Sequence, residues 1–161
     1  MLHFNNHFVA IARMPVEEQP GPLRELEAFA KQMPTLARLL GPAVTKVANA
    51  YHRNVAQLRC CLIMLAAERY RLAQGHWPAA IADLVPKYLP AVPLDPYDGA
   101  PLRLRLLKDG LVIYSVGDNR QDDGGQIRVE PGKTGPPLDW GYRLWDVPRR
   151  RQPPKPPSKD D

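Results

Sequence analysis

The residues between Ala43 and Gln74 carry the clearest periodic pattern of the chain, and they constrain its fold more than any other stretch. Apolar side chains recur there at spacings of four and three, the period of one face of an α-helix, with Arg69 as an exception in the series. The pattern predicts one helix of about thirty residues, long enough to be the spine on which the rest of the fold lies. The apolar face consists of Val44, Ala48, Tyr51, Val55, Leu58, Leu62, Leu65 and Leu72.

Gly75 is expected to end this helix, because glycine adopts the left-handed backbone conformation of a helix C-terminus without strain. Pro78 then prevents the helix from resuming directly. Between Ala79 and Tyr88, apolar residues at i, i+3 and i+4 predict a further short helix, before Pro90 and Pro93 impose an extended chain.

Two alternating segments follow, from Leu102 to Leu107 and from Leu111 to Val116. Lys108-Asp109-Gly110 stands between them, and an Asp-Gly pair in such a place is a strong signal for a tight hairpin turn. One face of the hairpin can pack on the helix. The sequence therefore predicts the α+β class, with a long N-terminal helix packed against a small antiparallel β-hairpin or sheet.

The 161 residues include 19 prolines and 11 glycines, so regular structure is expected to cover only part of the chain. The N-terminal residues show no clean period, and Gly41-Pro42 is interpreted as a point where the chain restarts. The expected division is a lead-in with a short helix at 1–42, the helix plus sheet domain at 43–130, an extended connector with a last strand at 131–147, and a disordered Pro- and Arg-rich tail at 148–161.

Three short motifs follow in order along the middle of the chain. Glu68 to Pro78 ends in Gly-His-Trp-Pro, Leu94 to Leu102 contains Asp-Pro-Tyr-Asp-Gly, and Val112 to Asp118 reads Val-Ile-Tyr-Ser-Val-Gly-Asp. In this order they resemble the globular part of the major pseudopilin (protein G) of type II secretion, and more closely still the pseudopilin-like C-terminal segments of uncharacterised planctomycete-type proteins. The resemblance covers roughly half of the chain, from the low fifties to about residue 125.

The resemblance implies a pilin-like globular domain with a non-enzymatic structural or interaction role, and with protein partners or self-association. The chain departs from true pseudopilins, which begin with a glycine followed by Phe-Thr-Leu-x-Glu and an apolar filament helix. No signal peptide is predicted, and the longest apolar run, Cys60 to Ala67, is far shorter than the roughly 20 residues of a membrane span. An extracytoplasmic or periplasmic location is therefore expected only through a membrane anchor upstream of Met1.

The loop from Asp118 to Gly125 is the candidate site. Calcium takes oxygen ligands from carboxylates, amides and backbone carbonyls, and a glycine-containing loop can bring them together. The resemblance adds that true pseudopilins bind calcium in the loop after Tyr-Ser-x-Gly. The alternative is a solvated acidic turn, since Asp, Asn and Gly favour turns for local reasons. The candidate calcium ligands are Asp118, Asn119, Asp122 and Asp123.

No other grouping of reactive side chains supports catalysis, so neither an enzymatic function nor a small-molecule substrate is expected. Asp95 and Asp98 fit a turn better than an acid/base pair. The histidines lack a zinc spacing, and His76 is expected to cap or pack at the helix end. Cys60 and Cys61 are helix neighbours that point about 100° apart, which excludes a disulfide between them. Three aromatic side chains are expected in the core rather than on a stacking platform: Trp77, Tyr97 and Tyr114.

A binding module for anionic partners such as nucleic acid is the alternative function. The net charge is +5 and the isoelectric point is near 9.4. The dense basic group is Arg149 to Arg151, with Arg103 and Arg105 as further contacts, but the other positive charges are spread along the chain. The polar face of the long helix is expected to be solvated surface, and it carries Lys46, Arg53, Gln57 and Arg71.

Overall fold

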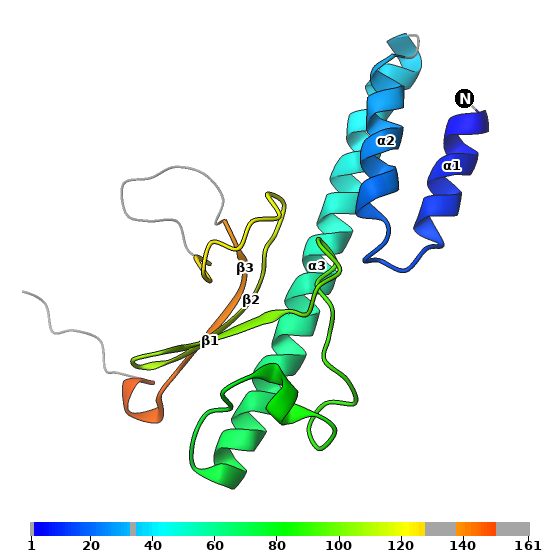
Figure 1. The fold of residues 1–161 in the computed structure, drawn as a ribbon. Helices are drawn as coiled ribbons and strands as arrows, with labels where there is room; N and C mark the ends of the chain where they lie inside the picture. Colours follow the sequence, from blue (N-terminus) through cyan, green and yellow to red (C-terminus); the bar gives the residue numbers. More distant parts are fainter. Residues whose placement is uncertain (1, 33–34, 128–137, 151–161) are drawn as a thin grey trace, which may run out of the picture.

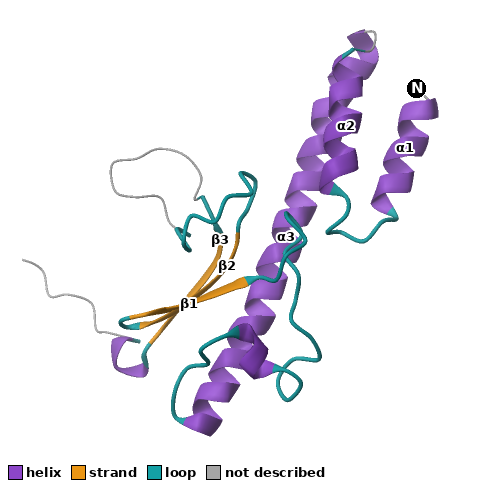
Figure 2. Cartoon of the chain, in the orientation of Figure 1, coloured by secondary structure: helices purple, strands orange, loops and turns teal. Residues whose placement is uncertain are grey.

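One long helix runs the length of the molecule and carries a small antiparallel sheet on one side, in a computed structural model that describes residues 2–32, 35–127 and 138–150 (Figures 1 and 2). The α+β class predicted from the sequence is confirmed. The elements are α1 (Leu2–Ala12), α2 (Pro20–Lys31), α3 (Thr35–Gln74), the 3-10 helix η1 (Ile81–Leu84), β1 (Arg103–Leu107), β2 (Gly110–Ser115), β3 (Trp140–Trp145) and the 3-10 helix η2 (Val147–Arg149).

The long helix begins earlier than the sequence pattern indicates. It starts at Thr35, is 40 residues long and continues through Gly41-Pro42, so the predicted restart of the chain at that point is wrong. A proline inside a helix costs about 3 kcal/mol, and the packing of α3 against α2 and the sheet must offset this cost. Within the described ranges, no helix is both long and apolar enough to cross a membrane.

The N-terminal segment, predicted as an irregular lead-in, contains the helix α1. It lies beside α2 and the N-terminal half of α3 (Figure 1). A small apolar cluster joins the three helices through Ile11 of α1, Leu23 and Leu26 of α2, and Ala48 of α3. The sequence pattern did not indicate this helix because polar residues, among them Asn5, Asn6 and His7, interrupt its apolar residues, although Phe8 packs beside the buried Ile11 in the structure.

The end of α3 is as predicted. Gly75 has a φ of +81°, and its N–H donates to the Arg71 carbonyl at 2.8 Å. His76 packs at this end, with its ring edge-on to Tyr70 at a centroid distance of 5.6 Å. The predicted short helix is η1. Asp83 Oδ2 stabilises its start by accepting the N–H groups of Ala79 and Ala80, the two residues that precede the helix.

The predicted hairpin forms the first two strands of the sheet. β1 and β2 pair antiparallel from Arg103 opposite Tyr114 to Leu107 opposite Gly110, so Lys108-Asp109 makes the turn. β3 pairs with the other edge of β2, which confirms the predicted last strand and gives the order β1-β2-β3.

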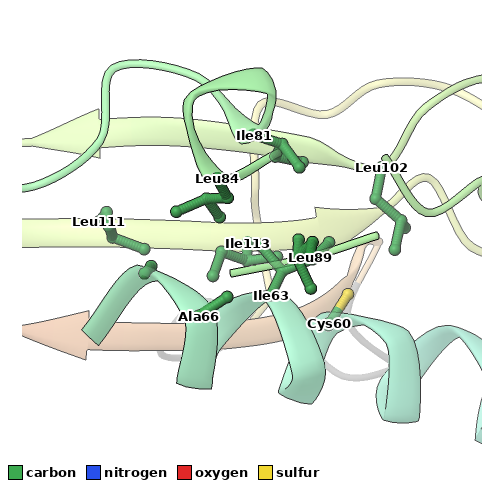
Figure 3. Packing of buried hydrophobic residues seen from close by; sticks show 10 residues of the cluster. Cys60, Ile63, Ala66, Ile81, Leu84, Leu89, Leu102, Leu111 and Ile113 are labelled. Atoms are coloured by element: carbon green, nitrogen blue, oxygen red, sulfur yellow. The ribbon is translucent and has the colours of Figure 1, made fainter. Parts of the chain in front are cut away.

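The main core lies between α3 and the inner face of the sheet (Figure 3). Cys60 and Ile63 of α3 face Leu111 and Ile113 of β2, and Leu84 of η1 closes the side of the cluster. Of the aromatic side chains predicted in the core, Tyr97 and Tyr114 are buried and Trp77 is half-buried. The remaining buried members are Ala66, Ala67, Ile81, Leu89 and Leu102.

The sheet packs on a different face of α3 from the one that the sequence predicts. Leu62 of the predicted face is 56 % exposed, whereas its neighbour Ile63 is fully buried. The buried face is rich in small residues, with Ala56, Cys60 and Ala67 at 0 % exposure. Large side chains from the sheet and η1 fill the space that these small residues leave, because facing surfaces interdigitate best when large residues oppose small ones.

The C-terminal part of the described chain is fixed to the end of α3. Arg150 forms two hydrogen bonds with Glu68, and Trp77 Nε1 donates to Asp146 Oδ1 at 2.7 Å. The predicted disorder is therefore wrong for residues 148–150, which a composition argument cannot distinguish from the rest of the tail. Residues 151–161 lie outside the described ranges.

Candidate functional site

The acidic loop after β2 folds back over the outer face of the sheet, which is turned away from α3. Val112 and Tyr114 point to this outer face because they alternate with the core-facing residues of β2. Gly125 lies against both: a Cβ added to it would be 2.8 Å from Cγ1 of Val112 and 3.2 Å from the Tyr114 ring. The loop therefore buries the second face of the central strand.

Two side chains of the hairpin hold the loop in place. The Tyr114 hydroxyl donates to Asp122 Oδ1 at 2.9 Å, and Arg105 Nη1 donates to the carbonyl of Gly124 at 2.7 Å. Burial, together with the hydrogen bond to Asp122, raises the pKa of Tyr114 to about 12. The Tyr114 hydroxyl therefore remains a donor at neutral pH.

Most of the candidate calcium ligands accept hydrogen bonds within the loop itself. Asp122 Oδ1 also accepts the N–H of Gly124 at 2.9 Å, and Asn119 Oδ1 accepts the N–H of Gln121 at 3.0 Å. Asn119 Nδ2 donates to Asp123 Oδ2 at 2.7 Å. These are the local side-chain contacts that form turns.

Asp118 lies apart from the other acidic residues of the loop. It lines a pocket between α2, α3 and the loop, together with His52, Tyr97 and Arg120, whereas Asp123 lines the groove on the outer face of the sheet. In the part of the chain that the structure describes, no three His, Cys, Asp or Glu residues are gathered closely enough to hold a metal. The four predicted ligands thus share one loop but do not converge in this conformation.

Asp139 is a loop anchor that the sequence analysis did not single out. Its side chain is fully buried, and Oδ2 accepts the N–H groups of Gly125 and Gln126 at 2.8 and 3.0 Å. Burial raises its pKa above the usual value for an aspartate. Among the residues described, Oδ1 has no hydrogen-bond partner. The available signal was its position directly before β3, where a lone acidic residue precedes an apolar strand.

Asp95 is a structural centre between the turn before β1 and the end of β2. Its fully buried carboxylate accepts the N–H groups of Tyr97 and Val116 at 3.0 and 2.9 Å, and the hydroxyl of Ser115 at 2.8 Å. Arg103 Nη1 lies 2.8 Å from Asp95 Oδ2. These bonds join the turn before β1 to the end of β2.

His52 and Tyr97 form a second polar feature that the sequence did not indicate. Both side chains are buried and line a cavity of about 150 Å³ with Asp118 and Arg120. Burial lowers the pKa of His52, so the ring is neutral at physiological pH. Burial, followed by the Asp118 carboxylate that faces its hydroxyl, raises the pKa of Tyr97 above its usual value. His52 Nε2 has no hydrogen-bond partner among the described side chains and backbone.

The arginines proposed for an anionic partner make intrachain contacts. Arg103 pairs with Asp95 and Asp98, Arg105 donates to the loop, and Arg149 Nη1 lies 3.9 Å from Asp109. Arg151 lies outside the described residues. On the polar face of α3, Lys46 and Arg53 are exposed as predicted, whereas Gln57 and Arg71 are half-buried.

Comparison of the chain with family models, with curated proteins and with solved structures yields no match. The likeness to pseudopilins therefore rests on the sequence motifs alone.

Proposed function

We propose that this chain is a non-enzymatic structural or interaction module of the pseudopilin-like kind. The observation that carries the proposal is that each of the three motifs has a structural task in the fold. Gly75 ends α3. The Asp95 carboxylate joins the turn before β1 to the end of β2, because it accepts hydrogen bonds from Ser115 and Val116 of the third motif. Asp95, Asp98 and Ser115 of these motifs make hydrogen bonds within the chain, while Tyr97 and Asp118 line the cavity beside His52.

We propose further that calcium stabilises the acidic loop. The loop offers carboxylate, amide and carbonyl oxygens on one segment, which are the ligand types that calcium takes. Because Asp118 and Asp123 face different pockets, binding has to reorient at least one of them. The proposal therefore implies both a gain in stability and a local change of the loop.

The test is thermal unfolding of the full chain in a chelator and in calcium at about 1 mM, the range of extracellular calcium modules. We expect the melting temperature to rise by a few degrees, since a ligand at about ten times its Kd adds about 1.4 kcal/mol to the stability of a domain. Amide resonances of residues 118–125 should shift in the same titration.

Asp123→Asn is the informative variant. It removes one carboxylate charge and keeps an oxygen for Asn119, whereas Asp122 also holds Tyr114 and Gly124 and its loss would destabilise the loop without any metal. The matched control is Glu25→Gln on α2, which removes an exposed carboxylate outside the loop. If calcium moves neither the melting temperature nor the loop resonances, the calcium proposal is wrong and the structural role stands without it.

A further inference from the structure

α3 has a second apolar face, here called the outer stripe, on the side that does not meet the sheet. Its side chains are each more than half exposed, although large apolar residues on a helix are usually buried. The outer stripe consists of Val47 at 67 % exposure, Tyr51 at 53 %, Leu58 at 66 %, Leu62 at 56 %, Leu65 at 56 % and Leu72 at 71 %.

The spacing of this stripe is that of a coiled-coil seam. From Tyr51 to Leu72 the steps are four, three, four, three, four and three residues, through the half-buried Val55 and through Arg69. A heptad pattern with apolar residues at two positions keeps one face of a helix against another helix. The part of the stripe from Tyr51 to Leu72 covers 21 residue steps, or about 32 Å along the axis.

The exposed area is large enough for a stable contact. At about 50 Å² of exposed apolar surface for each half-exposed side chain, the stripe presents on the order of 300 Å², which is the size at which patches on monomers are often functional. Two facing stripes bury about 600 Å². Since apolar atoms make up about 60 % of an interface, the total is about 1,000 Å², the threshold for a specific interface.

We propose that α3 pairs with α3 of a second copy of this chain through the outer stripe, in an antiparallel arrangement. A heptad seam is complementary to another heptad seam, and a two-fold axis lets the same surface serve both copies. In the described part of the chain, neither α1 nor α2 covers the seam, because its residues remain exposed with both helices in place.

The one charge in the seam decides the orientation. In a parallel pair Arg69 would face Arg69 of the second copy, and two like charges in an apolar seam repel each other. In an antiparallel pair centred near residue 60, Arg69, whose guanidinium lies 5.7 Å from the ring centroid of Tyr88 in its own chain, has Tyr51 of the second copy on its other side. An arginine over a tyrosine ring is attracted by the ring face.

The same register provides a place for Leu72, the most exposed residue of the stripe. It brings Leu72 level with Ala48 of the second copy, which α1 and α2 cover, and therefore against the apolar groove of about 390 Å³ beside it, between α1 and α3. The groove is lined by Phe8, Val47 and Tyr51 among others. Leu72, near the C-terminal end of each α3, thus lies against the groove near the N-terminal end of the outer stripe of the second copy.

This proposal is independent of calcium, because the outer stripe and the acidic loop are separate surfaces. The test is sedimentation equilibrium of the full chain. We expect a dimer at about 100 μM and a melting temperature that rises with protein concentration. Leu62→Glu, which places a charge against Leu58 of the second copy, should weaken the dimer at least about tenfold.

Gln57→Glu is the matched control, because it introduces the same side chain on the same helix outside the stripe. Its dimer should be as strong as that of the wild type. Both variants should keep the wild-type circular dichroism spectrum, since neither residue is in the core. A wild-type chain that stays monomeric at about 1 mM, or a dimer unaffected by Leu62→Glu, overturns the proposal; a monomer that binds lipid vesicles instead assigns the stripe to a membrane surface.

Cys61 tests the antiparallel arrangement. It lies beside the seam, half-exposed, and in the proposed register the two Cys61 side chains meet next to the two-fold axis. A short bismaleimide should join wild-type chains into a covalent dimer, and Cys61→Ser should abolish this product because Cys60 is buried. A dimer that depends on Leu62 but is not linked through Cys61 overturns the antiparallel register.

Discussion

Arg150 donates two parallel hydrogen bonds to the carboxylate of Glu68, from Nη1 to Oε1 at 3.0 Å and from Nη2 to Oε2 at 2.9 Å, across 82 residues of sequence. Arg71 donates to the same carboxylate, with Nη2 2.6 Å from Oε1. The guanidinium groups of both arginines lie over the ring of Trp77, at 5.8 and 5.3 Å. One carboxylate therefore fastens the end of the described chain to the end of α3.

We expect Glu68→Gln to flatten the loss of stability in acid. The hydrogen bonds from Arg150 and Arg71 lower the pKa of Glu68 from 4.5 to about 2. Because the folded-state pKa is depressed, the stabilisation is present above about pH 4.5 and is lost as the pH falls toward 2. The group is partly solvated, so the wild type should lose only about 1 kcal/mol more than the variant over this range. Urea unfolding at a series of pH values measures this, and identical pH slopes would contradict it.

Gly125→Ala should destabilise the chain more than Gly75→Ala. Both glycines have a φ of +81°, so both substitutions carry the same backbone strain of about 1 kcal/mol. A Cβ at Gly75 meets open space, whereas at Gly125 it meets Val112 at 2.8 Å. We expect about 1 to 2 kcal/mol of additional destabilisation at Gly125 from this overpacking. Equal free energies of unfolding for the two variants would mean that Gly125 is not packed closely against Val112 of the sheet.

Asp95→Asn should be far more damaging than Asp98→Asn, although both carboxylates pair with Arg103. Asp95 is fully buried, so its substitution leaves donors unpaired in the interior and should cost about 3 kcal/mol. The Asp98 side chain is 24 % exposed and should cost about 1 kcal/mol or less. Chemical denaturation of the two variants gives the comparison directly, and costs of equal size would rule out a structural centre at Asp95.

The two adjacent cysteines should differ in reactivity. Cys60 is fully buried, and its burial, followed by the nearby Asp95 charge, raises its pKa to about 12. The thiolate is the reactive form, so this thiol should be inert at pH 8 in the folded state. Labelling with a maleimide followed by mass spectrometry should show one fast site, absent from Cys61→Ser. Rapid labelling of Cys60 in that variant would show that the contact between α3 and the sheet opens readily.

Local signals account for the parts of the fold that the sequence predicts correctly. The Asp109-Gly110 turn and the alternation around it specify the hairpin, and Gly75 followed by Pro78 specifies the end of α3. The acidic loop is also visible as a segment. Its contact with the outer face of the sheet is not visible, because it depends on side chains of other segments: Tyr114 and Arg105 of the hairpin, and Asp139 before β3.

The amino-acid pattern by itself determined that α3 is a helix, where it ends, and that a two-stranded ribbon follows, because backbone conformation responds to neighbours a few residues away. Only the tertiary structure decided which side of α3 the sheet covers. A heptad of leucines and a row of alanine, cysteine and isoleucine are both apolar faces, and the second one is covered because large side chains of the sheet and η1 fit closely against small ones. The face that is covered is the one whose shape fits the sheet and η1. A single stretch of the chain does not reveal this fit, because it depends on residues from all three elements together.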